Sequence, residues 1–331
     1  MRHLVTGGGG FIGSHLVDAL LARGDEVVVV DDFSTGRAEN VEHLLEAPGF
    51  ELVTGSILDP DVVNECVASV EWVFHLASAV GVQLIVRDPL RSLLTNVRGI
   101  DEVLAAAARH GKRLLFTSTS EVYGKNGAGS LREDSDHVLG SPFKSRWSYA
   151  TSKAIGEALA HAYSAERGAE MVVARLFNTV GPRQTGAYGM VLPRLIGQAL
   201  RGEDLTVYGD GTQTRCFVHV ADTVRALVLL VEEEAATGNA YNVGTSEPVA
   251  IIALAQRVIE RTESQSRVSL VPYEEAYEPG FEELGHRVPD TTALRELTGW
   301  MPTRGLDESI DDVVAYEANR LRATESATLA N

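Results

Sequence analysis

The sequence predicts an α/β protein built on a doubly wound parallel sheet, with a smaller lobe formed mainly by its C-terminal half. Three observations support this fold class. A glycine-rich turn joins an apolar strand to a helix at the N-terminus, strand-like runs then alternate with helical stretches as far as Arg175, and short segments punctuated by Gly, Pro and Arg begin near Leu176. Such alternation is typical of βαβ units whose helices cover both faces of a parallel sheet.

The first strand–turn–helix unit lies at the N-terminus. The apolar run His3–Thr6 is followed by glycines with GxxGxxG spacing at Gly7, Gly10 and Gly13. Apolar residues then recur with helical period until Gly24, which closes the helix. A turn of this kind lets backbone N–H groups and the helix N-terminus approach a pyrophosphate. The unit therefore predicts a dinucleotide-binding turn of the Rossmann type.

A carboxylate follows the second strand. The β-branched run Glu26–Val30 is typical of a buried parallel strand, and Asp31 comes directly after it, 18 residues past Gly13. A carboxylate at this position accepts hydrogen bonds from the adenosine ribose and repels a 2′-phosphate. The sequence therefore predicts NAD as the cofactor rather than NADP.

The alternation of strands and helices continues through the first half of the chain. Strand-like runs fall at Glu51–Thr54, Trp72–Leu76, Arg113–Thr117 and Glu170–Arg175. Helices are predicted over Pro89–Arg109 and Trp147–Arg167, and later near Val191–Arg201, Asp222–Glu232 and Val249–Arg261. These elements predict a parallel sheet, with helices packed on both of its faces.

The patterns divide the chain into three segments. Residues 1–176 are expected to form the NAD-binding Rossmann domain, and residues 177–316 mainly a substrate-binding lobe from which some segments return to the sheet. Residues 317–331 are expected to be a tail, a fraying helix that becomes disordered. The lobe would lie over the C-terminal edge of the sheet, where open α/β folds bind ligands.

The amino-acid composition argues against several classes of binding partner. The 331 residues carry a formal net charge of −17, which argues against nucleic acid or an anionic membrane surface. No apolar run reaches the ~18 residues of a membrane span, and charged residues interrupt the N-terminal apolar stretch, unlike a signal peptide. Cys66 and Cys216 lie far apart and the histidines lack metal-ligand spacing, so no disulfide framework or metal site is predicted. We expect a cytoplasmic protein.

Two short stretches contain the candidate catalytic residues. TSTSEVYG supplies the hydroxyl of Thr119 and the carboxylate of Glu121, and RWSYATSK supplies Tyr149 and Lys153. Because Tyr149 and Lys153 are four residues apart, both side chains leave one face of a helix. A free tyrosine has a pKa of about 10, and a nearby ammonium and nicotinamide cation are expected to lower it. This set predicts removal of a proton from an alcohol while a hydride leaves the same carbon.

Ordered motifs along residues 1–315 resemble those of the extended short-chain dehydrogenase/reductases that act on nucleotide sugars. They include TGGGGFIGSHL, DDFSTGR, FHLAS, TNVRG, YATSK, RLFNTVGPR, VYGDGTQTRCFVHVAD and YNVG. The resemblance implies a Rossmann fold, NAD retained through the catalytic cycle and a UDP-sugar substrate. It also implies a homodimer in which the helices Pro89–Arg109 and Trp147–Arg167 pair as a four-helix bundle.

Three features resemble UDP-glucuronate decarboxylases in particular. Glu121 stands two residues after Thr119, whereas simple 4-epimerases of the family usually lack this acid. The run STSEVYG…KSRWSYATSK is similar to the decarboxylase half of a bacterial enzyme that oxidises UDP-glucuronate. The segment Ala276–Asp290 resembles the stretch in which decarboxylases carry an arginine, here Arg287. Ser56 differs from the aspartate that commonly contacts adenine.

The implied reaction begins with oxidation of the sugar at C4. Tyr149 would take the O4 proton with Thr119 bonded to the same oxygen, and Lys153 would hold the nicotinamide ribose. Loss of carbon dioxide from C5 would follow, steered by Glu121 and Arg287 with Ser120 beside them, and would give UDP-4-keto-pentose or UDP-xylose. A UDP-sugar 4-epimerase, an NDP-hexose 4,6-dehydratase and a non-catalytic NAD or sugar-nucleotide sensor remain alternatives.

The resemblance also implies binding residues. For the cofactor they are Gly7, Gly10, Phe11, Ile12, Gly13, Asp31, Asp32, Ser34, Thr35, Gly36, Arg37, Ser56, Ile57, Leu76, Ala77, Ser78, Asn96, Thr117, Tyr149 and Lys153. For the substrate they are Asn178, Arg183, Val191, Leu192, Val207, Tyr208, Gln213, Arg215 and Arg287. Among these, Arg215 and Arg287 are the expected diphosphate clamps, since guanidinium groups match phosphate oxygens and offset the acidic field of the whole chain.

Overall fold

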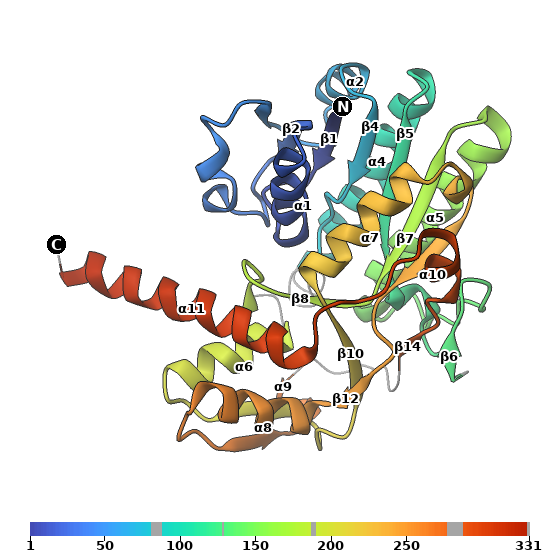
Figure 1. The fold of residues 1–331 in the computed structure, drawn as a ribbon. Helices are drawn as coiled ribbons and strands as arrows, with labels where there is room; N and C mark the ends of the chain where they lie inside the picture. Colours follow the sequence, from blue (N-terminus) through green and yellow to red (C-terminus); the bar gives the residue numbers. More distant parts are fainter. Residues whose placement is uncertain (81–87, 128, 187–189, 277–286, 330–331) are drawn as a thin grey trace.

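The computed structural model describes residues 1–80, 88–127, 129–186, 190–276 and 287–329. A seven-stranded sheet crosses the larger part of the molecule in the order β11-β7-β5-β4-β1-β2-β3, and all of its pairs are parallel. Its strands are β1 (Arg2–Thr6), β2 (Glu26–Asp31), β3 (Phe50–Thr54), β4 (Trp72–His75), β5 (Arg113–Thr119), β7 (Met171–Leu176) and β11 (Ala240–Val243). The predicted doubly wound α/β fold class is confirmed (Figure 1).

Helices cover both faces of this sheet because alternate strand residues point to opposite sides. On one face, Val27 and Val29 pack with α1 (Phe11–Ala22) and α7 (Val220–Glu232). On the other face, Val28 and Val30 pack with α2 (Pro60–Ala68), α4 (Pro89–Arg109) and α5 (Ser148–Arg167). Because both faces of the sheet are buried, the sequences of its strands are near-continuous apolar runs.

The lobe below the sheet in Figure 1 has its own apolar core. It contains α6 (Val191–Leu200), α8 (Ile251–Thr262) and α11 (Leu306–Leu329), with the parallel pair β9 (Leu205–Tyr208) and β13 (Val268–Val271). A second small sheet orders β12 (Pro248–Ala250), β10 (Thr214–His219) and β8 (Asn178–Val180). The short strand β6 (Ser130–Leu131) pairs with β14 (Val288–Pro289), and the short helices α9 (Tyr273–Ala276) and α10 (Thr292–Thr298) lie in the C-terminal part of the chain.

The C-terminal segment is helical as far as Leu329. Residues 317–331 were expected to be a fraying helix that becomes disordered, and α11 continues as one helix to Leu329. Its C-terminal part is rich in Ala, Leu, Arg and Glu, which favour helix, and it contains neither Gly nor Pro to end one. The disorder of the tail stays a prediction.

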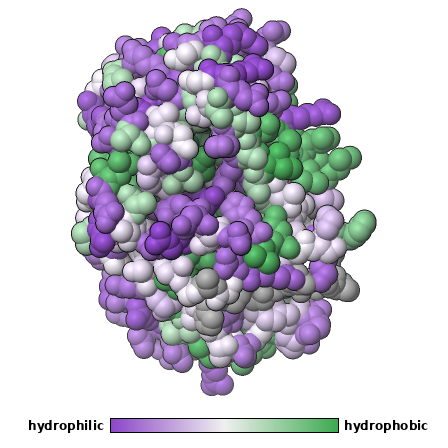
Figure 2. Space-filling model, turned by 90° about the vertical axis from the view of Figure 1, so that its right-hand side faces the viewer, coloured by the Kyte–Doolittle hydropathy of each residue, from purple (hydrophilic) through white to green (hydrophobic). Residues whose placement is uncertain are grey.

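The surface is largely hydrophilic on the side shown in Figure 2, with apolar groups gathered mainly toward one margin. Among the described helices, none combines the length and the apolar character that a membrane crossing requires. The two cysteines, Cys66 and Cys216, are buried and free.

Candidate active site

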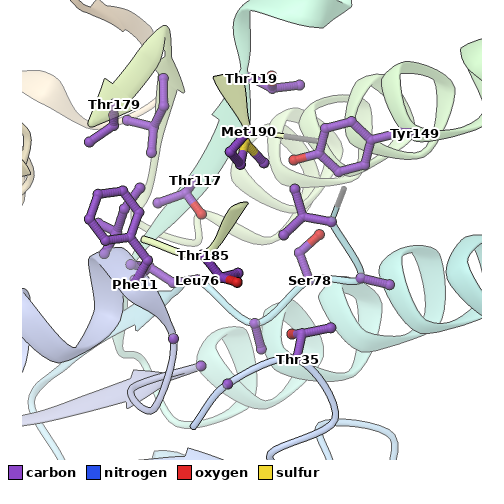
Figure 3. A pocket seen from close by; sticks show the side chains of 18 of the residues that line it. Phe11, Thr35, Leu76, Ser78, Thr117, Thr119, Tyr149, Thr179, Thr185 and Met190 are labelled. Atoms are coloured by element: carbon purple, nitrogen blue, oxygen red, sulfur yellow. The ribbon is translucent and has the colours of Figure 1, made fainter. Parts of the chain in front are cut away.

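A cavity of about 920 Å³ lies between the C-terminal edge of the sheet and the lobe. Its walls come from the glycine-rich turn, the ends of β2, β4 and β5, the start of α5, and lobe segments around β8 and β10. Figure 3 shows Ser78, Thr117 and Tyr149 projecting into the same space from three different segments. The cavity thus joins the part of the chain predicted to bind a dinucleotide with the part predicted to bind a substrate.

The glycine-rich turn has no room for side chains. Gly7 has a φ of +75°, and a Cβ there would lie 2.7 Å from the main-chain nitrogen of Ala77. A Cβ at Gly13 would lie 2.1 Å from the carbonyl oxygen of Gly7. Helix α1 starts immediately after Gly10, so its free N–H groups are at the cavity wall. Close backbone approach at a helix N-terminus suits a pyrophosphate, and these residues fit a dinucleotide.

Asp31 ends β2 and lines the same cavity. Its carboxylate accepts hydrogen bonds from the backbone N–H groups of Gly9 and Phe33, both at 2.8 Å. Burial raises the pKa of Asp31, and these two hydrogen bonds oppose that shift. A carboxylate has about four acceptor sites, so the oxygens keep capacity for the two hydroxyls of a ribose.

Tyr149 and Lys153 lie one turn apart on α5, as the spacing predicts. The Lys153 ammonium is 4% exposed and donates a hydrogen bond to the carbonyl of Thr117 at 2.9 Å. Burial lowers the pKa of Lys153 to about 7, and Glu157 opposes that shift. Lys153 therefore changes charge near neutral pH in the cofactor-free protein.

Several groups around Tyr149 act on its pKa. Burial raises the pKa of Tyr149, the negative charge of Glu121 raises it further, and a hydrogen bond with Ser78 opposes both. The Lys153 ammonium is 5.9 Å from the centre of the Tyr149 ring and donates a hydrogen bond to a backbone carbonyl. The predicted lowering of this pKa depends on a nicotinamide cation as well as on Lys153, and it stays a prediction.

Glu121 sits in the turn η3 (Ser120–Tyr123) that follows β5. Its main-chain N–H donates to the hydroxyl of Thr119 at 3.3 Å. The side chain of Arg287 donates to the hydroxyl of Ser120 at 3.2 Å. The arrangement brings Thr119, Ser120, Glu121 and Arg287 together on the cavity wall, although Arg287 is far from the others in sequence.

A second arginine, which the sequence analysis did not propose, contacts Glu121. Arg146 donates from Nη1 to Oε2 of Glu121 at 2.6 Å. Burial raises the pKa of Glu121, but the positive charges of Arg146, Arg287 and Arg215 outweigh burial and lower it. The available signal was the position of Arg146 in RWSYATSK, three residues before Tyr149 and so on the same side of a helix start.

Asn96, which is predicted to touch the cofactor, is not among the residues that line the cavity, and its contact with the cofactor stays a prediction. Its carboxamide oxygen accepts from the Ser78 hydroxyl at 3.0 Å and from the Ala79 N–H at 2.7 Å. Its carboxamide nitrogen donates to the Ala79 carbonyl and to the Ser152 hydroxyl. Asn96 therefore connects the segment after β4 with α5, because its carboxamide forms hydrogen bonds with both.

Val207 was expected to flank the nucleotide base, but its side chain is fully buried in the core of the lobe. Strand residues alternate in direction, and on β9 it is the next residue, Tyr208, that lines the cavity. The guanidinium of Arg194 lies 4.0 Å from the centre of the Tyr208 ring and lines the cavity as well. The sequence analysis did not propose Arg194.

The remaining predicted substrate residues all line the cavity. Asn178 donates to the Cys216 carbonyl at 3.0 Å, and Gln213 donates to the Tyr208 carbonyl at 3.0 Å. Arg183, with a φ of +67°, forms an ion pair with Asp18 at 2.7 Å. Val191, Leu192, Arg215 and Arg287 complete this set, and residues 277–286 of the segment quoted for Arg287 lie outside the described residues.

The predicted cofactor residues other than Asn96 also line the cavity. They are Gly7, Gly10, Phe11, Ile12, Gly13, Asp31, Asp32, Ser34, Thr35, Gly36, Arg37, Ser56, Ile57, Leu76, Ala77, Ser78, Thr117, Tyr149 and Lys153. Within the described part of the chain, no three His, Cys, Asp or Glu side chains come together as metal ligands.

Comparison with known proteins agrees with this geometry. The model of the NAD dependent epimerase/dehydratase family matches residues 3–244. UDP-N-acetyl-alpha-D-glucosaminuronate decarboxylase of Bacillus cytotoxicus is 39% identical over 316 residues, which cover 95% of this chain and 97% of that protein. UDP-glucuronic acid decarboxylase 1 of Danio rerio is 37% identical over 321 residues, which cover 97% of this chain and 73% of that protein.

Solved structures with the same fold include epimerases. UDP-glucose 4-epimerase from Thermotoga maritima, with UDP-glucose, has a TM-score of 0.87 and a sequence identity of 30%. The match covers 97% of this chain and 100% of that chain. UDP-glucuronic acid 4-epimerase from Bacillus cereus, in complex with UDP-glucuronic acid and NAD, has a TM-score of 0.86 at 29% identity, with 96% and 98% covered.

Proposed function

Because the chain belongs to the NAD dependent epimerase/dehydratase family, we propose that it is an NAD-dependent decarboxylase of UDP-glucuronate. The reaction oxidises C4 of the sugar and then releases the C5 carboxylate as carbon dioxide, giving UDP-4-keto-pentose or UDP-xylose. The observation that carries this proposal is the ionised Glu121, set among arginines beside Thr119 and Tyr149 at the wall of the cavity. The names of the two decarboxylase relatives support it.

The cofactor is NAD, which supplies the acceptor for the hydride that leaves C4 and can return it. The protein residues that would hold it are the glycine-rich turn at the start of α1 and Asp31 at the end of β2. The turn leaves the backbone exposed to a pyrophosphate, and Asp31 selects a ribose with a free 2′-hydroxyl. Lys153 lies between Thr117 and the cavity, within reach of a second ribose.

Proton transfer at the sugar O4 belongs to Tyr149, with the Thr119 hydroxyl as its partner on the same oxygen. Because Tyr149 has a raised pKa in the cofactor-free protein, it becomes a competent base only when a positive charge is added near it. The proton that Tyr149 removes stays at the site and can return to O4 when C4 is reduced again. Tyr149 is thus both the base and the acid of the cycle.

Decarboxylation needs little further catalysis once C4 is a ketone. The substrate is then a β-keto acid, which loses carbon dioxide as its electrons move into an enolate. Arg287 is 7% exposed and lines the cavity next to Ser120, where a guanidinium stabilises an oxyanion. Glu121, an ionised acceptor, orients a water or the sugar hydroxyls for reprotonation of C5.

A second substrate deserves equal testing, because the Bacillus cytotoxicus relative is named for UDP-N-acetylglucosaminuronate. The two sugars differ at C2, where one carries a hydroxyl and the other an acetamido group. Both have the C5 carboxylate and the C4 hydroxyl on which the proposed chemistry depends. The reaction class is therefore the same for either sugar.

We further propose a cytoplasmic homodimer paired through α4 and α5. These helices pack side by side on one face of the sheet, and they expose apolar side chains that include Leu90, Leu94 and Ile155. A second copy would bury them in a four-helix bundle. The free thiols of Cys66 and Cys216 suit a reducing compartment. The mass in solution, and its fall to that of a monomer in Ile155→Asp, test the pairing.

The function is tested by incubating the purified protein with NAD and, separately, UDP-glucuronate, UDP-N-acetylglucosaminuronate and UDP-glucose. Release of carbon dioxide from either uronate, with a pentose product in the proton NMR spectrum, supports the decarboxylase. A galacturonate product without carbon dioxide would make the protein a 4-epimerase. A 4-keto-6-deoxy product from UDP-glucose would make it a dehydratase, and binding without any product would leave a sensor.

A further inference from the structure

Arg146 holds the carboxylate of Glu121 from a turn that precedes the catalytic helix. It lies in η4 (Ser145–Trp147), next to the start of α5, and its Nη1 is 2.6 Å from Oε2 of Glu121. The two side chains are 10% and 19% exposed, so water screens the contact little. Charge-assisted hydrogen bonds of this length are stronger than neutral ones, and a guanidinium fixes the direction of the carboxylate as well.

The turn that carries Arg146 is itself anchored. Its neighbour Trp147 is fully buried and packs with Ala150 and Leu139. A Cβ at Gly140 would lie 2.1 Å from Nε1 of Trp147, so the loop passes directly against the indole. Because Trp147 is held by this packing, the main chain at Arg146 has a defined position, from which the Arg146 side chain contacts Glu121.

Other charged groups also face Glu121. Arg287 precedes β14, Arg215 lies on β10, and Tyr149 on α5 is close enough that the charge of Glu121 raises its pKa. Under the proposed function, Arg287 and Arg215 contact the diphosphate or the carboxylate of the substrate. Arg146 would then be the arginine that remains committed to Glu121 when the substrate is bound.

We propose that Arg146 is a positioning residue for the reaction, whose guanidinium keeps the Glu121 carboxylate turned toward the sugar beside Tyr149. The inference rests on the proposed function only for the role of Glu121 in decarboxylation. Without Arg146, Glu121 would lose its direct hydrogen-bond partner at the cavity wall. A misplacement of about 1 Å at a catalytic group can cost about 10²-fold in rate.

Arg146→Met removes the guanidinium and keeps the apolar stem, whereas Arg146→Lys keeps the charge. We expect kcat of Arg146→Met to fall by about 10²-fold with a smaller change in KM, and Arg146→Lys to recover part of that loss. The acidic limb of the pH profile of kcat should move to higher pH in Arg146→Met, since one cation beside Glu121 is gone. The control is Arg132→Met, because Arg132 and its partner Asp134 are largely exposed.

A double-mutant cycle tests whether Arg146 acts through Glu121. In a Glu121→Gln background, Arg146→Met should cause little further loss of kcat, because the carboxylate that it positions is absent. The same factor of loss in both backgrounds would mean that Arg146 acts independently of Glu121, and would overturn the proposal. Unchanged kcat in Arg146→Met would overturn it as well.

An infrared measurement separates this inference from the proposed function. The difference spectrum between wild type and Glu121→Gln shows the state of the Glu121 carboxyl without any turnover. We expect an ionised carboxylate at mildly acidic pH in the Arg146 protein and a protonated acid at the same pH in Arg146→Met. Identical spectra would refute the role of Arg146 even in an active decarboxylase. Failure of every uronate substrate would refute the function and leave this contact standing.

Discussion

The ammonium of Lys153 donates a hydrogen bond to the backbone carbonyl of Thr117 at 2.9 Å, and it lies 5.9 Å from the centre of the Tyr149 ring. The hydrogen bond therefore holds the Lys153 side chain, which comes from α5, against β5. Burial acts on the two groups in opposite directions, lowering the pKa of Lys153 and raising that of Tyr149. Burial thus favours the neutral form of both groups.

Replacement of Tyr149 by Phe should remove the base and acid of the cycle. Acid–base catalysis by one side chain contributes about 10²–10⁴-fold, so kcat should fall by that factor. The control is Tyr163→Phe on the same helix. The hydroxyl of Tyr163 donates a hydrogen bond to Asp101 at 3.1 Å, and neither residue lines the cavity. Binding of NAD, measured by calorimetry, should be little changed in either variant. Full activity in Tyr149→Phe would contradict the assigned role.

Stability of the cofactor-free protein should depend on pH through Lys153. Its folded pKa of about 7 lies below the unfolded value of about 10.4, so the unfolded chain binds more protons between these limits. The free energy of unfolding of wild type should therefore rise from pH 7 to pH 9 relative to Lys153→Met. Urea unfolding at several pH values measures this difference.

Gly13→Ala should damage the cofactor site and the fold together. The added Cβ would lie 2.1 Å from the carbonyl oxygen of Gly7, so the turn must open. Overpacking of a tight site costs about 1–3 kcal/mol, and the displaced backbone would no longer fit a pyrophosphate. Thermal melting and NAD titration measure the two effects. Gly127→Ala, where the Cβ would meet nothing within 4 Å, is the matched control and should change neither.

A buried ion pair beneath the site should be costly to break. Arg175 on β7 donates to both carboxylate oxygens of Glu157 on α5, and Ser118 donates to the same carboxylate. Because the two charged side chains are 7% and 10% exposed, Glu157→Gln should destabilise the fold by about 3–5 kcal/mol. Glu203→Gln breaks an exposed pair with Arg201, which water screens, and should change urea unfolding much less.

Much of the fold followed from local sequence patterns. Strands β1, β2, β3, β4, β5 and β7 of the main sheet were predicted to within about two residues because burial on both faces gives them continuous apolar runs. Helix α4 matched its predicted bounds because Asp88 and Pro89 begin it. Strand β11 and the short strands β6, β8, β9, β10, β12, β13 and β14 were not predicted, because short segments give weak apolar patterns.

The errors at the site have physical causes as well. Val207 was assigned from a motif, which places a residue near a cavity but does not give the direction of its side chain. Arg146 was missed because its partner Glu121 is 25 residues away, and no periodic pattern links them.

The most direct test of the proposed function uses UDP-glucuronate labelled with ¹³C at the carboxyl carbon, with the protein and NAD in one NMR tube. Decarboxylation predicts that the label moves into carbon dioxide and bicarbonate while a UDP-pentose accumulates. Glu121→Gln should slow this transfer and Arg132→Met should not. Retention of all the label in a uronate, with substrate turned over to another sugar, would contradict the account.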